Sequence, residues 1–232
     1  MVSHTFRPTH RRPAIVAVIG SSADLNLAAR LERPPDLFEL RLDRLAGALT
    51  QVERKMSRLP APIVITARHP LEGGANKLSA RRRRELLFRF LSHARYVDVE
   101  LRSVPVFLSL LEQAERQKVR RIISVHYLRS TPPSGVLRAR AHLAMAHGAD
   151  IFKVATRTDT PAELARLINF FSNAEAGVAI SAMGIGKLGA ISRLLLACAG
   201  SAFVYVSLGK SDIAGQMSLD QFRALTGAAF RR

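Results

Sequence analysis

The feature that most constrains the fold of this chain is an eightfold alternation of short β-rich runs with segments of helical apolar spacing. We interpret the β-rich runs as strands over residues 14–20, 37–43, 62–68, 96–101, 121–127, 151–156, 177–183 and 202–208. Their starts lie 23 to 34 residues apart, which is the length of one βα unit. Strict alternation implies a parallel sheet, and eight units predict a single (β/α)8 TIM barrel of the α/β class. An open doubly wound sheet is the rival, and the number eight favours the barrel.

The length and composition allow one domain with a substantial core. The chain has 232 residues, and 48% of them are hydrophobic, so it can bury enough apolar surface to fold. We expect a basic tail over residues 1–12 and a barrel catalytic domain over residues 13–232, because no shift in composition divides the rest. The sequence has no apolar run of membrane-spanning length and no secretory h-region, so we expect a cytoplasmic protein with no membrane partner. The single cysteine, Cys198, excludes an internal disulfide framework.

The chain is strongly basic. It has 35 lysine and arginine residues against 18 acidic ones, a formal net charge of +17, and only six of the 35 are lysine. Such charge is typical of proteins that bind polyanions, which makes a nucleic-acid-binding protein one hypothesis. Tryptophan is absent and aromatic residues make up 6% of the chain, so few side chains are available for stacking on bases. We therefore favour a chain with no nucleic-acid partner and interpret the run Arg81–Arg84 as a solvated helix face.

Polar side chains recur near the C-terminal ends of the predicted strands, where a barrel places its catalytic groups. In the second strand Glu39, Arg41 and Asp43 alternate with apolar residues, so they share one face, the barrel interior. Charges buried there must pair with one another or with a ligand. The third to sixth strands carry Arg68, Asp98, Glu100, His126 and Lys153. Polar outer faces on half-exposed strands would explain one such strand, but five in succession indicate one site at the barrel mouth.

Lys153 is the strongest catalytic candidate. The chain uses arginine for most of its basic positions, yet this lysine lies inside the apolar run of the sixth strand. Arginine keeps its proton in proteins, whereas a partly buried lysine can lose one and attack a ketone or aldehyde to form a Schiff base. Desolvation and a nearby Arg41 or Arg68 would favour the neutral amine. The alternative is a structural ion pair between Lys153 and Glu39.

His126 is the candidate proton carrier. Among the seven histidines it lies near the end of a predicted strand, while the others fall in predicted loops or helices. Imidazole exchanges protons near neutral pH, and Glu72, Asp98 or Glu100 could fix its tautomer. We expect no metal ion, because the chain has no His-Glu-x-x-His pattern and a cationic mouth would repel a metal.

Motifs around these residues follow one another in a fixed order from about residue 36 to residue 220. They are Glu39-x-Arg41-x-Asp43, Thr66-Ala67-Arg68 with Glu72-Gly73-Gly74, Asp98-Val99-Glu100-Leu101, Ser124-Val125-His126 with Thr131-Pro132, Gly148–Ala155 around Lys153, Met183-Gly184, Gly186-Lys187-Leu188-Gly189, Ser192-Arg193 and Gly215-Gln216. As a set they resemble the type I 3-dehydroquinate dehydratases of the shikimate pathway. The first predicted strand carries no motif of this family.

The resemblance implies a (β/α)8 barrel that works as a homodimer without cofactor or metal. It implies a lyase that dehydrates the small anionic substrate 3-dehydroquinate to 3-dehydroshikimate by syn elimination of water, the third step of that pathway. By this likeness Lys153 forms a Schiff base with the C3 ketone. His126 removes the C2 proton and then protonates the departing C1 hydroxyl, while Glu72 and Asp98 orient it. The residues expected to bind substrate are Glu39, Arg41, Arg68, Arg193 and Gln216, with the last two on the carboxylate.

One loop departs from the family's pattern. Where the family commonly has Ser-Ala-Pro-Gly-Gln, this chain has Asp212-Ile213-Ala214-Gly215-Gln216. Aspartate at the usual serine position would repel a carboxylate substrate unless the loop shifts and offers Ser211 instead. Loss of the proline also predicts a more mobile lid.

Two further interpretations compete with this one. A class I aldolase or transaldolase also carries a Schiff-base lysine in this fold. Those enzymes often bind phosphate after the seventh and eighth strands, whereas Arg193 and Gln216 suit a carboxylate. The segment Gly184–Gly189 matches a dinucleotide-binding pattern, but its late place in a barrel favours glycines that let the seventh loop approach the substrate.

Overall fold

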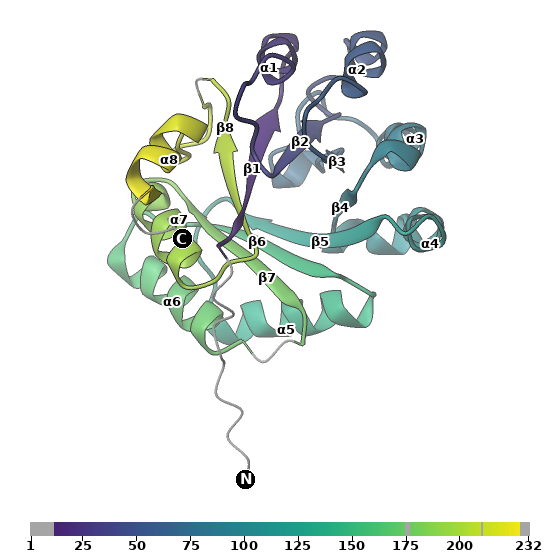
Figure 1. The fold of residues 1–232 in the computed structure, drawn as a ribbon. Coiled ribbons are helices and arrows are strands. Elements are labelled where there is room, and N and C mark those ends of the chain that lie inside the picture. Colours follow the sequence, from purple (N-terminus) through teal and green to yellow (C-terminus); the bar gives the residue numbers. More distant parts are fainter. Residues whose placement is uncertain (1–11, 175–176, 210, 228–232) are drawn as a thin grey trace.

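The computed structural model describes residues 12–174, 177–209 and 211–227, and within them eight parallel strands form a barrel surrounded by helices (Figure 1). The strands are β1 (Ala14–Ile19), β2 (Leu37–Arg41), β3 (Ile63–Thr66), β4 (Tyr96–Glu100), β5 (Arg120–Tyr127), β6 (Ile151–Arg157), β7 (Ala179–Ile185) and β8 (Phe203–Ser207). The α-helices are α1 (Ser22–Ala28), α2 (Leu49–Met56), α3 (Ala80–Phe90), α4 (Leu108–Arg116), α5 (Ser134–Ala146), α6 (Pro161–Ser172), α7 (Gly189–Cys198) and α8 (Leu219–Thr226). Short 3-10 helices are η1 (Pro70–Glu72), η2 (Leu91–His93) and η3 (Leu101–Val106). The predicted (β/α)8 barrel is confirmed, and the strand bounds agree with the predicted ones to within two residues.

The barrel is nearly closed, with its seam between β7 and β8. Parallel backbone ladders run in the order β7-β6-β5-β4-β3-β2-β1-β8. Across the seam, among the described residues, the contacts come from strand ends and hydroxyl groups. The N–H of Ala202 donates to the carbonyl of Ile180 at 2.8 Å, and Ser181 Oγ donates to the carbonyl of Phe203 at 3.2 Å.

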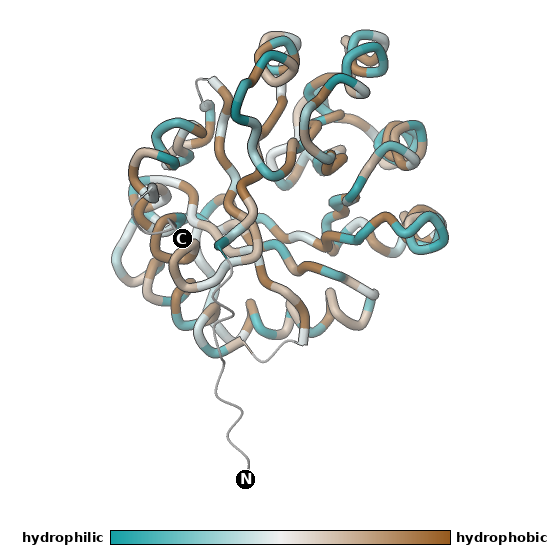
Figure 2. The backbone as a smooth tube through the Cα atoms, viewed as in Figure 1, coloured by the Kyte–Doolittle hydropathy of each residue, from teal (hydrophilic) through white to brown (hydrophobic). Residues whose placement is uncertain are grey.

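The described residues form two hydrophobic clusters, one between the barrel and its helices and one inside the barrel. Outward-facing strand residues such as Phe38, Leu40 and Leu42 pack beneath the helices, and Figure 2 shows hydrophilic segments mainly on the outer turns of those helices. Inside the barrel, an apolar cluster comes mostly from the N-terminal halves of the strands and includes an edge-to-face contact of Tyr96 with Phe203 at 5.2 Å. The base is therefore filled by apolar side chains, and the charged interior residues Glu39, Asp98 and Lys153 begin at the third residue of their strands.

Helix caps define the loops at that mouth, because each α-helix begins on the side where the preceding strand ends. Ser79 caps α3 through its side chain. Thr160 with Glu163 forms a capping box at α6, and Ser218 with Gln221 forms one at α8. Such caps satisfy the free N–H groups of the first helical turn and hold the loop in one entry geometry.

The interpretation of Arg81–Arg84 as a solvated face is wrong for one member. Three of these arginines are exposed, but Arg83 is only 1% exposed. Its place in the helix explains this, because Arg83, Leu86, Leu87 and Phe90 recur at the spacing of one helical face. That face is the buried face of α3.

The predicted tail over residues 1–12 lies outside the described residues except for Arg12, whose guanidinium makes two hydrogen bonds to Asp36 at 2.7 and 2.9 Å. Among the described residues, no helix is both long and apolar enough to cross a membrane.

Candidate active site

A cavity of about 300 Å³ opens at the C-terminal ends of the strands. Most of the residues predicted for the site line it: Glu39, Arg41, Arg68, Glu72, His126, Lys153, Arg193 and Gln216. Asp98 is buried beside these residues but does not line the cavity, and Ser211 lies in a neighbouring, smaller hollow. The alternation of side chains along the strands thus brings together groups from β2, β3, β5 and β6.

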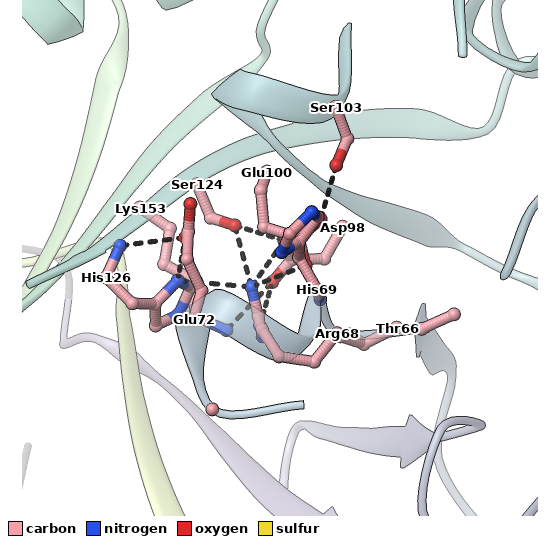
Figure 3. Close-up of polar contacts among 12 residues, drawn as sticks. Thr66, Arg68, His69, Glu72, Asp98, Glu100, Ser103, Ser124, His126 and Lys153 are labelled. Atoms are coloured by element: carbon pink, nitrogen blue, oxygen red, sulfur yellow. Dashed lines mark hydrogen bonds and ion pairs between the residues drawn. The ribbon is translucent and has the colours of Figure 1, made fainter. Parts of the chain in front are cut away.

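Lys153 is held in the barrel interior by two carboxylates. Its side chain is almost wholly buried, and Nζ donates to Asp98 Oδ2 at 2.9 Å and to Glu39 Oε1 at 3.3 Å (Figure 3). Nζ also lies 3.8 Å from the ring centre of Tyr205, a cation–π contact. The nearest charged partners are therefore carboxylates rather than the arginines expected from the sequence. The ion pair with Glu39 is present, and the amine still lines the cavity.

Arg68 is the cation around which the interior carboxylates gather. Its Nη2 lies 3.0 Å from Asp98 Oδ2 and 3.8 Å from Glu39 Oε1, and its Nη1 lies 3.4 Å from Glu100 Oε1. Burial disfavours the charged guanidinium, but Asp98, Glu100 and Glu39 outweigh burial and raise the pKa of Arg68 above its ordinary value. Arg68 is therefore fully compensated by its own chain.

His126 contacts Glu72, which the short helix η1 carries to the mouth. Glu72 Oε2 lies 2.9 Å from His126 Nδ1 and accepts the His126 backbone N–H at 3.0 Å. Burial, Arg68 and Lys153 lower the pKa of His126 well below its ordinary value. Burial and Glu100 raise the pKa of Glu72 to about 7. We assign the imidazole proton to Nδ1 from the contact with Glu72, which leaves the lone pair on Nε2.

Asp98 contacts Lys153 rather than His126, which differs from the expected orienting role. Its oxygens accept from Lys153 Nζ, from Arg68 Nη2 and from Ser124 Oγ, the last at 2.6 Å. The reason is depth, because Asp98 pairs in register with Ile122, four residues before His126. Burial alone would raise the pKa of Asp98, but Arg68 and Lys153 hold it far below its ordinary value.

Arg41 is paired at the end of its own strand. Its Nε and Nη2 donate to the two oxygens of Asp43 at 3.0 and 2.9 Å, and Nη2 also reaches the carbonyl of Gly73 at 3.3 Å. Burial opposes ionisation of Asp43, yet Arg41 and the backbone N–H groups of Ala75 and Arg68 lower its pKa. This bidentate pair fixes the guanidinium plane of Arg41 beside the cavity.

Arg193 is a buried cation with no carboxylate partner in the described part of the chain. It lies on α7, and its Nη1 donates to the carbonyl of Tyr205 at 2.9 Å and lies 3.5 Å from Met183 Sδ. Its Nε is buried without a hydrogen-bond partner among the described residues. Burial lowers the pKa of Arg193 to about 10. A desolvated guanidinium in this state is suited to bind an anion.

The loop between β8 and α8 presents Asp212 to the cavity and turns Ser211 away. Ser211 Oγ donates to Gln216 Oε1 at 2.6 Å and accepts the backbone N–H of Ile213 at 3.0 Å. The Asp212 carboxylate pairs with Arg44 Nη1 at 3.2 Å. In this conformation Ser211 buttresses Gln216, and Arg44 partly neutralises the charge that would repel an anionic substrate.

Close contact between two glycine-containing loops sets the position of Gln216. Gly215 has φ of +78°, and a Cβ there would come within 2.5 Å of the carbonyl oxygen of Gly186. Gly186 and Gly189 therefore serve the packing of this loop against Gly215, whereas Gly184 lies close to the side chains of Thr158 and Ser192.

Two residues of the site, Arg83 and Tyr205, were not among those predicted, and Glu100, which was expected beside His126, pairs with two arginines instead. Glu100 joins Arg68 to Arg83, and Tyr205 lies under the Lys153 amine. The alternation of Phe203 and Tyr205 in the eighth strand, and the helical spacing around Arg83, are the signals that could have found the two missed residues.

The arrangement combines three chemical elements in one cavity. It has a buried primary amine, an imidazole that is neutral near pH 7, and a guanidinium without an anionic partner. An amine forms a Schiff base with a carbonyl compound, a neutral imidazole removes a proton, and a free guanidinium binds a carboxylate. These groups suit proton abstraction next to a carbonyl in a small anionic molecule.

Comparisons with known proteins agree with this chemistry. A family model described as Type I 3-dehydroquinase matches residues 15–230. A 3-dehydroquinate dehydratase from Pyrococcus abyssi is 36% identical over 193 residues, which cover 82% of this chain and 86% of that protein. One from Thermococcus gammatolerans is 32% identical over 210 residues, covering 90% and 94%. The crystal structure of 3-dehydroquinate dehydratase from Geobacillus kaustophilus superposes with a TM-score of 0.83 at 27% identity, covering 94% of this chain and 93% of that one.

Proposed function

The chain belongs to the type I 3-dehydroquinase family, and we propose that it dehydrates 3-dehydroquinate to 3-dehydroshikimate through a Schiff base on Lys153. The observation that carries the residue assignment is the position of Lys153, which is 3% exposed and lines the same cavity as Glu39 and His126. A buried amine held at the centre of a polar cavity is placed for covalent catalysis.

The first stage forms the imine. Lys153 gives up a proton, for which the Glu39 carboxylate at 3.3 Å is a nearby acceptor. The free amine attacks the C3 carbonyl carbon, and one amine proton moves to the carbonyl oxygen. The proton held on Glu39 then completes the water that leaves. The protonated imine that results withdraws electrons from C2 and makes the C2 proton acidic.

The second stage eliminates water across C1 and C2. His126 Nε2 takes the C2 proton, and the electron pair of that C–H bond moves onto the imine to give a neutral enamine. The enamine expels the C1 hydroxyl, which takes the proton back from His126 and leaves as water. Hydrolysis of the conjugated imine releases the product and restores Lys153. Because one imidazole serves both proton transfers, the elimination is syn.

Substrate binding follows from the charges that line the cavity. Arg193, with its unpartnered Nε, binds the substrate carboxylate, and Gln216 assists from the lid loop. Arg41 and Glu39 contact the substrate hydroxyls, since both are buried groups with atoms at the cavity wall. Arg68 holds the carboxylates around Lys153 in place.

We also propose a homodimer that works in the cytoplasm, as the family resemblance implies. Ile191 and Leu195 lie about one turn apart on α7 and are 48% and 46% exposed, so they offer an apolar pair to a second copy. Sedimentation equilibrium should give the mass of two chains, and Leu195→Glu should shift it toward one. A monomer at all concentrations would exclude the dimer.

Borohydride trapping tests the proposed function directly. Wild-type protein is reduced in the presence of 3-dehydroquinate and digested, and its peptides are mapped by mass; we expect the adduct on Lys153. Lys153→Ala should abolish both the adduct and the absorbance of the conjugated enone product. Lys118→Arg, at an exposed position after α4, is the matched control and should keep both. An adduct on another lysine would overturn the assignment, and cleavage of a sugar phosphate without enone formation would indicate an aldolase instead.

A further inference from the structure

Arg83 crosses from the outer helix α3 to the ends of β3 and β4. Its Nε donates to the carbonyl of Ala67 at 2.7 Å, and its Nη2 reaches Ser103 Oγ at 3.1 Å and Glu100 Oε2. The ring of Phe107 lies 5.0 Å from the guanidinium carbon. All these partners are buried, so the Arg83 side chain is enclosed within the wall of the barrel.

Glu100 stands between two guanidinium groups. Its Oε2 accepts from Arg83 and from Ser103 Oγ at 3.0 Å. Its Oε1 lies 3.4 Å from Arg68 Nη1 and accepts the backbone N–H of His69 at 2.8 Å. Because Glu100 is fully buried, loss of Arg83 would leave Glu100 Oε2 with one neutral donor, Ser103 Oγ. The carboxylate would then be free to move.

The two contacts of Glu100 Oε1 lead to the two groups that touch His126. Arg68 Nη1 lies 3.3 Å from His126 Nδ1. His69 caps η1, which ends at Glu72, and Glu72 Oε2 lies 2.9 Å from the same Nδ1. Figure 3 shows this convergence. Glu100 therefore holds both the turn of Glu72, which accepts from His126 Nδ1, and Arg68, whose positive charge lies beside that nitrogen.

From this geometry we propose that Arg83 is a positioning residue for His126, acting through Glu100 on Arg68 and on the turn that carries Glu72. The inference rests on the proposed function, in which His126 moves the proton between C2 and the leaving hydroxyl. A purely structural Arg83 would anchor α3 to the barrel without affecting the imidazole. The two roles differ in what they predict for proton transfer.

The charge of Glu100 also acts on the protonation of the site. The charged groups facing Glu72 are Arg102, whose Nε lies 3.4 Å from Oε1, Glu100 and Arg68. Those facing His126 are Arg68, Lys153, Asp98, Arg41 and Glu72. Removal of the Arg83 charge would leave the negative charge of Glu100 less fully balanced by positive charge. Glu72, which faces Glu100, would then hold its proton to higher pH and be a weaker acceptor for His126 Nδ1.

Arg83→Met and Arg83→Lys test the proposal, with the exposed Arg81→Met on the same helix as the matched control. The kcat and KM for 3-dehydroquinate are measured across pH, and active sites are counted by borohydride trapping. We expect Arg83→Met to lower kcat about tenfold to a hundredfold, with KM near the wild-type value. The acid limb of the kcat profile should move to higher pH. Arg83→Lys should return the limb to its wild-type position and recover part of kcat, and Arg81→Met should match the wild type.

An unchanged kcat and acid limb in folded Arg83→Met would overturn the inference, whatever its stability. If Arg83→Met does not fold, Arg83→Lys decides, because lysine keeps the charge but cannot reproduce the planar guanidinium that holds Glu100 and Ser103 together, and a wild-type kcat in that variant would overturn the inference. The proposed function fails separately, since it would show as absence of turnover in both the wild type and Arg81→Met. In that case the inference falls with it.

Discussion

Two buried arginines of the same cavity, Arg68 and Arg193, are each 3% exposed and have opposite surroundings. Arg68 lies among Glu39, Asp98 and Glu100, which raise its pKa. Arg193 has a backbone carbonyl and a thioether as its neighbours, and burial lowers its pKa to about 10. Arg68 is therefore a structural cation that the chain's own carboxylates neutralise, whereas the counter-ion of Arg193 must come from outside the chain.

The contrast has its origin in the strands that each arginine reaches. Arg68 follows β3, and the neighbouring strands β2 and β4 both direct carboxylates into the barrel. Arg193 extends from α7 toward β7 and β8, whose nearby interior side chains are Met183 and Tyr205. One half of the mouth is therefore a closed network of charges, whereas in the other half Arg193 lies beside Met183 and Tyr205 with no carboxylate partner among the described residues.

Loss of the compensated arginine should have the largest effect. Arg68→Met leaves three carboxylates around a lost cation, so we expect the free energy of unfolding to fall by about 3–5 kcal/mol. Urea denaturation at neutral pH measures this, with the exposed Arg58→Met as control. A loss within about 1 kcal/mol, the range of a surface pair, would mean that Lys153 and Arg83 suffice to compensate the three carboxylates.

The fold could be predicted almost completely because it depends on local periodicity. Alternation of apolar residues marks each strand, and only strand ends differ from the prediction. The seventh strand begins two residues late, at Ala179, because Gly177 has φ of +61°, which no strand adopts. It continues to Ile185 because β6 extends beside it to Arg157.

The site could be predicted only where it depends on side-chain parity. Glu39 and Lys153 were expected in the interior, and both lie there because alternate residues of a strand share one face. The partner of Asp98 depends on how deep it lies relative to His126, which strand register sets and a single strand does not reveal. Arg83 was misassigned because a run of like charges suggests solvent, while the helical spacing of its apolar neighbours places it inside.

Titration of Glu72, which lies in the same half of the site as Arg68, should change the free energy of unfolding by an intermediate amount. The pKa of Glu72 is raised from an ordinary 4.5 to about 7, so the native state binds its proton more tightly than the unfolded state. Its contribution to stability is fully present below about pH 4.5 and is lost as the pH rises through about 7, a change of about 3 kcal/mol. Unfolding of wild type and Glu72→Gln is compared from about pH 4 to pH 8, since shared groups cancel in the difference. The glutamine variant should gain relative stability as the pH rises, and a constant difference would show that Glu72 titrates normally.

Loss of the uncompensated arginine should have the smallest effect on the free protein and a clear one on binding. Arg193→Met removes a desolvated charge without stranding a carboxylate, so we expect unfolding free energy equal to or above the wild-type value. A charge-assisted hydrogen bond to the substrate carboxylate is worth about 1.5–3 kcal/mol, so KM should rise about 10- to 150-fold. The change in unfolding free energy should therefore be zero or opposite in sign to that of Arg68→Met. If Arg193→Met instead destabilises the protein as strongly as Arg68→Met, Arg193 already has a counter-ion in the free enzyme.

Binding of the product tests the same guanidinium through the melting temperature. The product concentration that raises the wild-type Tm is applied to Arg193→Met, because a ligand stabilises the folded state only as far as it binds. Absence of that shift in Arg193→Met alone would locate the carboxylate at this guanidinium.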